Sequence, residues 1–179
     1  MKKIGMIGVG NMGGAILRGM IASGYVAAGD VMACLHSEEK CQALAAEIPG
    51  LTCTTDAKEL AHGCHMIVLA VKPQVLGTML DEIKGEINDR ALVSIAAGWT
   101  MDMLTSKVAG TTATLLRVMP NTPALVGAGM TAICRRSPRL IWHMRRVFLM
   151  QLAKRRSLTR NCLTASSRSA AAVRRISSC

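Results

Sequence analysis

The sequence of 179 residues has few aromatic side chains, which make up 2% of it. Half of the residues are nonetheless apolar, so methionine, leucine, valine, isoleucine and alanine must fill the core. No segment approaches the roughly 20 uninterrupted apolar residues of a membrane-spanning helix. We therefore expect a chain with a sizeable core, no membrane partner and a cytoplasmic location.

Paired cysteines are also missing, because the seven cysteines include no C-x-x-C pair. Their odd number and spacing disfavour a disulfide framework, and no His/Cys/Asp cluster has the spacing of metal ligands. We expect reduced, mostly buried thiols and no metal. The Lys2-Lys3 pair before an apolar run imitates a secretory signal, but the glycines that follow do not suit a signal helix.

Acidic residues are absent from the last quarter of the chain. Residues 1–134 contain ten Lys/Arg and eleven Asp/Glu, whereas residues 135–179 contain twelve Lys/Arg and no acidic residue. The formal charge of +11 therefore comes from the tail alone. We expect a folded domain over residues 1–134 and a basic tail of low order over residues 135–179.

Glycine is abundant at the start of the chain, in the stretch IGMIGVGNMGGAIL. Gly8, Gly10 and Gly13 form a G-x-G-x-x-G pattern after an apolar run and before an amphipathic segment. In such a strand–turn–helix unit, the first glycine permits the turn and the second lets a pyrophosphate approach. The third allows close helix–strand packing. The pattern predicts a dinucleotide site at the N-terminus of a helix beginning near Asn11, and a purely structural glycine turn is the alternative.

Short apolar runs alternate with amphipathic segments up to about residue 134. The expected strands are residues 3–9, 31–35, 51–54, 65–71, 91–97 and 114–119, with a seventh over residues 130–133. This alternation predicts an α/β domain with a doubly wound, parallel, Rossmann-like sheet. Ligands of such sheets bind outside the carboxyl ends of the strands, where we find AVKPQ, AAG and MPNTPA.

The end of the second strand reads CLHS, residues 34–37, and lacks a carboxylate. NAD enzymes usually place Asp or Glu there for the ribose 2′-hydroxyl. His36 and Ser37 can instead hydrogen-bond a 2′-phosphate, which favours NADPH over NADH. The alternative is that His36 and Lys72 are solvent-exposed residues that do not contact a cofactor.

The segments GVGNMG, LAVKPQ, SIAAG and RVMPNTPALVGAGMTAI together resemble the pyrroline-5-carboxylate reductase family, over residues 1 to about 134. The resemblance implies reduction of 1-pyrroline-5-carboxylate to L-proline, the last step of proline biosynthesis, with NADPH preferred and NADH possible. No residue is assigned as catalytic. The predicted cofactor-binding residues are Gly8, Val9, Gly10, Asn11, Met12, Gly13, His36, Ser37, Ala70, Val71, Lys72, Pro73, Ala96, Ala97, Gly98, Asn121 and Thr122.

Two local departures from the family pattern affect the adenosine end of the cofactor. The family often has Asn-Arg-Ser where this chain has Leu35-His36-Ser37, so His36 replaces a stronger cation and selection for NADPH would be looser. Relatives frequently have Asp-Asn where this chain has Asp56-Ala57. One contact to the adenosine ribose is then expected to be missing.

The basic tail departs from the family altogether. The family continues with an all-helical domain that supplies dimerisation and most substrate contacts, and residues 135–179 have no in-frame match to it. The stretch CLTASSRSAAAVRRISSC can be encoded so that a neighbouring frame reads LDGIVALSGSSPAYIFM, which is family-like. We expect a frameshift near residues 134–136 and impaired activity. The rival hypothesis is a genuine arm for nucleic acid or acidic lipid.

Two other functions stay open at this point. A small NADP-dependent oxidoreductase of the 3-hydroxyacid dehydrogenase type shares the glycine turn but is not expected to contain MPNTPALVG. A non-catalytic nucleotide-binding module would have the same first half.

Overall fold

The computed structural model describes residues 1–120 and 131–135, with side chains described up to Met119. The elements in chain order are β1 (Lys2–Ile7), α1 (Asn11–Ala22), η1 (Ala28–Asp30), β2 (Val31–Cys34), α2 (Glu38–Glu47), β3 (Thr52–Thr54), α3 (Ala57–Gly63), β4 (Cys64–Leu69), α4 (Pro73–Ile83), η2 (Lys84–Glu86), β5 (Ala91–Ser94), α5 (Met101–Lys107), β6 (Thr114–Pro120) and β7 (Thr131–Arg135). The predicted tail beyond Arg135 lies outside the described residues.

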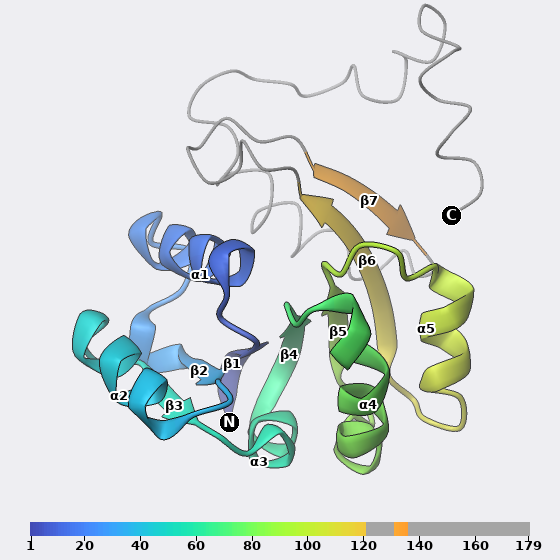
Figure 1. The fold of residues 1–179 in the computed structure, drawn as a ribbon, viewed down its shortest axis with the longest axis horizontal. Helices are drawn as coiled ribbons and strands as arrows, with labels where there is room; N and C mark the ends of the chain where they lie inside the picture. The colour runs from blue at the N-terminus through green and yellow to red at the C-terminus, as the bar shows by residue number, and fades with distance from the viewer. Residues whose placement is uncertain (121–130, 136–179) are drawn as a thin grey trace, which may run out of the picture.

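The strands form one sheet in the order β3-β2-β1-β4-β5-β6-β7 (Figure 1). The first six strands pair in parallel, and β7 pairs antiparallel with β6. From β1 the chain winds outward to β3, crosses to β4 beside β1, and winds outward again. The sheet is therefore Rossmann-like, as the alternating pattern predicts, with its reversal of strand order between β1 and β4.

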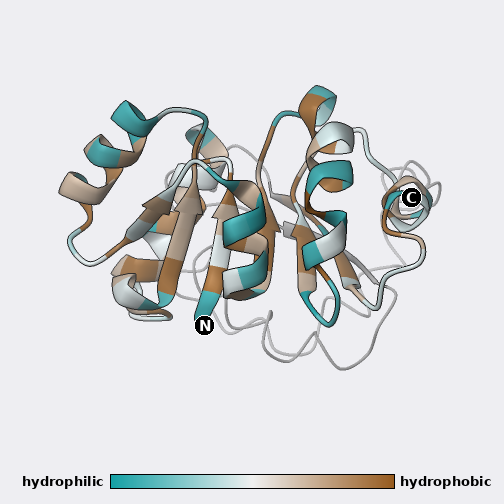
Figure 2. Ribbon diagram, turned by 90° about the horizontal axis from the view of Figure 1, so that it is seen from below, coloured by the Kyte–Doolittle hydropathy of each residue, from teal (hydrophilic) through white to brown (hydrophobic). Residues whose placement is uncertain are grey.

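Helices cover the sheet in two layers, each with its own cluster of buried side chains. One cluster includes Leu60 of α3, Leu76 of α4 and Leu104 of α5, and the other includes Leu17 of α1 and Leu44 of α2. Neighbouring strand residues alternate between the clusters because successive side chains of a strand point to opposite faces. Figure 2 shows mostly hydrophobic strands beneath helices whose outer surfaces carry hydrophilic segments.

The fourth and fifth strands are shorter than their apolar runs predict. The expected strands over residues 65–71 and 91–97 end in the structure at Leu69 and Ser94. The Ser94 hydroxyl accepts a hydrogen bond from the Ala96 amide at 3.4 Å, which turns the chain out of the sheet. Ala96 is still buried, so its apolar character reflects packing in a loop and not a longer strand.

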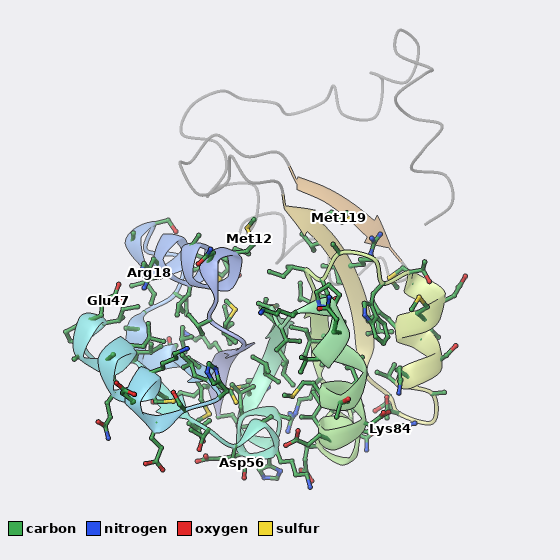
Figure 3. All side chains as sticks on the ribbon, viewed as in Figure 1. Met12, Arg18, Glu47, Asp56, Lys84 and Met119 are labelled. Atoms are coloured by element: carbon green, nitrogen blue, oxygen red, sulfur yellow. The ribbon has the colours of Figure 1, made fainter. Side chains whose placement is uncertain are left out.

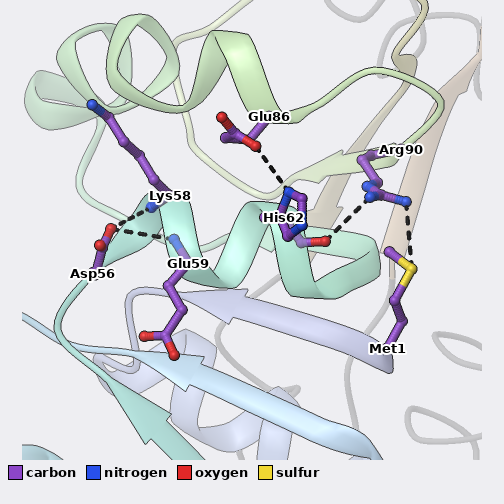
Figure 4. A network of polar contacts seen from close by, with 7 residues as sticks. All are labelled: Met1, Asp56, Lys58, Glu59, His62, Glu86 and Arg90. Atoms are coloured by element: carbon purple, nitrogen blue, oxygen red, sulfur yellow. Dashed lines mark hydrogen bonds and ion pairs between the residues drawn. The ribbon is translucent and has the colours of Figure 1, made fainter.

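Polar contacts fix the crossover between the two halves of the sheet (Figure 4). The carboxylate of Asp56 caps α3, accepting from the Lys58 amide at 2.8 Å. At the other end of α3, His62 pairs with Glu86 at 3.1 Å and its carbonyl accepts from Arg90. His62 is exposed and is held by structural contacts.

The side chains of four cysteines are described, Cys34, Cys41, Cys53 and Cys64, and all four are free thiols. Burial raises the pKa of both Cys34 and Cys64 to about 11, so these thiols are protonated and unreactive at neutral pH. Within residues 1–120 and 131–135, no group of His, Cys, Asp or Glu is arranged to hold a metal ion. None of the helices described there is long and apolar enough to cross a bilayer.

Candidate functional site

The glycine turn between β1 and α1 is fixed by close backbone contacts. Gly8 has a φ of 87°, and a Cβ on it would lie 2.9 Å from the Ala70 carbonyl oxygen. A Cβ on Gly13 would lie 2.4 Å from the Gly8 carbonyl oxygen and 2.9 Å from the Ala70 Cβ. Both positions therefore require glycine, one for the turn and one for the helix–strand contact, as the fingerprint predicts.

Gly10 differs from its neighbours because it faces open space. No atom lies within 4 Å of where its Cβ would be, and its own φ of −78° would suit any residue. Gly10 is the N-cap of α1, and no side chain caps that helix. The first-turn N–H groups thus border an open surface at the positive end of a 12-residue helix. This arrangement fits the diphosphate of a dinucleotide.

The loops after β4 and β5 lie at the same edge of the sheet as the glycine turn. The Ala70 amide donates to the Ile7 carbonyl at 2.8 Å, and the Ile95 amide donates to the Leu69 carbonyl at 3.2 Å. These hydrogen bonds join the start of each loop to the neighbouring strand. Most of the predicted cofactor-binding residues therefore follow the carboxyl ends of strands that adjoin in the sheet: Val9, Asn11, Met12, Ala70, Val71, Lys72, Pro73, Ala96, Ala97 and Gly98. Figure 3 shows Met12 at the sheet end of α1 and Met119 at the end of β6.

A lysine of α2 lies beside His36, one of the two residues predicted to contact a 2′-phosphate. Ser37 is the N-cap of α2, and its hydroxyl accepts from the Lys40 amide at 3.4 Å. The Lys40 Nζ lies 3.2 Å from Nε2 of His36. Both side chains are exposed. Lys40 is not among the residues predicted from the sequence, although its i, i+4 spacing from His36 places both residues on one side of the chain at the start of α2.

A second missed residue joins the two loops after β4 and β5. The Trp99 indole N–H donates to the Pro73 carbonyl at 2.9 Å. Trp99 is partly buried against the cluster beneath α4 and α5. No spacing motif signals this contact, because its partners are 26 residues apart.

The loop after β6 contains two of the predicted cofactor-binding residues. Asn121 and Thr122, predicted to border the nicotinamide, lie outside the described residues. Arg117 of β6 is 5% exposed, and its Nη2 lies 3.0 Å from the Met119 sulfur. Its burial in β6 is that of a structural residue.

A surface hollow of about 370 Å³ lies away from this edge of the sheet. It is lined by residues of α5 and of the segment that leads into β6, such as Thr105, Thr111 and Thr114. None of its lining residues is among the predicted cofactor contacts. The candidate site is therefore the open carboxyl edge and not this hollow.

Known proteins resemble this chain in sequence and in fold. The family model described as "NADP oxidoreductase coenzyme F420-dependent" matches residues 3–98, more than half of the chain. A pyrroline-5-carboxylate reductase of Escherichia coli K12 is 46% identical over 133 residues, which cover 74% of this chain and 49% of that protein. The chain thus spans about half the length of the curated relatives it matches.

Two solved structures support the same assignment. The pyrroline carboxylate reductase of Plasmodium falciparum, with NADP bound, has a TM-score of 0.72 and 27% identity over 84% of this chain and 55% of that one. The enzyme of Coxiella burnetii has a TM-score of 0.75 and 26% identity over 85% and 57%. The chain belongs to the family of NADP oxidoreductases described as coenzyme F420-dependent, and its described part is an N-terminal domain of the pyrroline-5-carboxylate reductase type.

Proposed function

We propose that this domain binds NADPH and presents its nicotinamide for the reduction of 1-pyrroline-5-carboxylate to L-proline. The observation that carries the proposal is the uncapped α1 N-terminus, which opens onto free space over Gly10 at the point where strand order reverses. The NADP held by the structurally similar Plasmodium reductase supports the same cofactor.

Each part of the edge has a task in this proposal. The N–H groups at Gly10 and Asn11 bind the diphosphate. The exposed Ala97 and Gly98, with Lys72, border the ribose and nicotinamide. The cofactor supplies the hydride, and the domain contributes position and exclusion of water. A protonated C=N group needs little further acid help, which agrees with the lack of any assigned catalytic residue in residues 1–120.

Preference for NADPH follows from the charges at the end of β2. His36 and Lys40 place a hydrogen-bonding ring and a cation side by side, and no carboxylate lies at the strand end itself. Glu38 and Glu39 follow in the first turn of α2 and reduce the net attraction. We therefore propose NADPH over NADH with a moderate ratio.

Residues 135–179 are proposed to be family sequence translated out of frame. The whole enzyme acts as a homo-oligomer through its helical domain in this proposal, and it is cytoplasmic and binds no specific nucleic acid. This chain, without that domain in frame, is proposed to bind the cofactor weakly and to turn over little. Reading the DNA of the gene tests the tail directly, because a neighbouring frame that stays family-like supports the frameshift and an unrelated frame contradicts it.

Calorimetric titration of the full chain with NADPH, NADH and ATP tests the cofactor assignment. We expect the order NADPH, then NADH, with ATP binding much more weakly. Equal binding of ATP and NADPH would support the non-catalytic nucleotide module. Proline formation by this chain is expected to be slight, so the deciding result is oxidation of 3-hydroxyacids on the same preparation: clear turnover of those substrates would support the 3-hydroxyacid dehydrogenase alternative.

A further inference from the structure

Trp99 links two loops that have no other side-chain hydrogen bond between them among the described residues. Its indole N–H donates to the carbonyl of Pro73, the first residue of α4, at 2.9 Å. The loop after β5 therefore meets the loop after β4 through one directional contact. Both loops belong to the proposed nicotinamide half of the cofactor site.

The indole ring has a prepared place on α4. A Cβ on Gly77 would lie 3.3 Å from the indole Cη2 and 3.4 Å from Cζ2, so the ring lies directly over this glycine. Gly77 is one turn after Pro73 on the same helix. The hydrogen bond and the ring contact together define one orientation of the side chain.

The residues around Trp99 explain why this orientation matters for the loop. Gly98, which precedes it, is exposed and has a φ of 79°. Thr100, which follows it, is the N-cap of α5 and accepts from the Met103 amide at 3.2 Å. Trp99 is therefore the anchor between a conformationally free glycine and the fixed start of a helix.

We infer that Trp99 is a positioning residue that sets the spacing between Ala70–Pro73 and Ala96–Gly98 for the ribose–nicotinamide half of the cofactor. It acts through the backbone of both loops. Within the part of the chain that the structure describes, its hydrogen bond and its ring contact are with α4, and not with the diphosphate turn or the end of β2. The inference rests on the proposed function. It adds a residue that affects binding of the nicotinamide half of the dinucleotide and not of the adenosine half.

The test compares two ligands on the full chain: NADPH, and adenosine 2′,5′-bisphosphate, which lacks the nicotinamide half. Trp99→Phe removes the N–H donor, and we expect NADPH to bind about three- to tenfold more weakly while the bisphosphate binds unchanged. Gly77→Ala crowds the ring without removing it, and we expect a smaller loss in the same direction. It also decides the test if Trp99→Phe fails to fold.

Glu86→Gln is the control. It removes the ion pair between His62 and Glu86, 3.1 Å long, which joins α3 to η2 away from both loops and from Gly77, and it should change neither affinity. Equal losses for both ligands in Trp99→Phe, or no loss for NADPH, would overturn the inference. If the wild-type chain binds NADPH no more tightly than the bisphosphate, the nicotinamide half adds no affinity. That result would overturn the inference about Trp99 but would leave the diphosphate site at the glycine turn standing. Wild-type chain that binds neither ligand would contradict the proposed function itself.

Discussion

The two halves of the sheet, β1–β3 and β4–β6, fix the loops at their carboxyl ends in different ways. In the first half, Gly8 and Gly13 fix the turn because no side chain fits there. In the second half, a large side chain, Trp99, joins the loops. The helices differ likewise. An ion pair joins α1 to α2 through Arg18, whereas another ion pair joins α4 to α5 and the Trp99 indole contacts α4 from the loop before α5. The glycines of the first half form a local sequence pattern, although they also pack against Ala70, whereas the Trp99 contact of the second half joins residues that no local pattern links.

Gly13→Ala should have the largest effect on this comparison. The new Cβ would meet the Gly8 carbonyl oxygen at 2.4 Å, and neither backbone can yield without opening the turn. We expect a loss of about 3 kcal/mol in the free energy of unfolding, measured by denaturant titration. Gly29→Ala is the control because no atom lies within 4 Å of its Cβ position. An equal loss in both variants would show that the contact at Gly13 is not what fixes the turn.

Gly10→Val sharpens the comparison by separating folding from binding. The open space over Gly10 accepts the side chain, so the free energy of unfolding should change by no more than about 1 kcal/mol. The branched side chain fills the space assigned to the diphosphate, and NADPH should bind at least about tenfold more weakly. Calorimetry and thermal melting of one preparation report both quantities. Unchanged affinity would place the diphosphate elsewhere.

Lys40→Gln should affect the choice of coenzyme and not the fold. Loss of the cation beside His36 is expected to weaken NADPH binding about tenfold and to leave NADH binding unchanged. Lys84→Gln, at η2 (labelled in Figure 3), is the control for charge alone. If Lys40→Gln weakens the binding of NADPH and of NADH equally, Lys40 does not contact the 2′-phosphate.

The ion pair between α1 and α2 should give the smallest effect. Arg18 Nε lies 2.6 Å from the Glu47 carboxylate, and this hydrogen bond holds the pKa of Glu47 below its ordinary value (Figure 3). A carboxyl whose pKa is lowered by folding stabilises the protein above its unfolded pKa and loses that contribution as the pH falls. Both side chains are about half exposed, so the contribution is small.

Melting of Glu47→Gln and wild type at two pH values checks that sign. The variant should melt slightly below wild type at neutral pH, and the difference should shrink as the pH falls below the ordinary pKa of a glutamate carboxyl. A difference that grows as the pH falls would contradict the assignment.

The features that the sequence predicts are those with a local pattern, and the features that it does not predict depend on contacts between distant residues. The alternating pattern predicted a doubly wound, Rossmann-like sheet, and the glycine spacing predicted the turn, because both patterns lie among neighbours in sequence. Strand ends at Leu69 and Ser94 were predicted too late, since packed loop residues such as Ala96 are apolar as well. Trp99 was missed because its partner lies 26 residues away.

Backbone amide NMR of the full chain during titration with NADPH tests the central claim most directly. We expect chemical-shift changes at the amides of Gly8, Gly10, Gly13 and Gly98. The amides of Thr111 and Thr114, around the distant hollow, should be unchanged. Shifts confined to that hollow, or none at saturating NADPH, would contradict that claim.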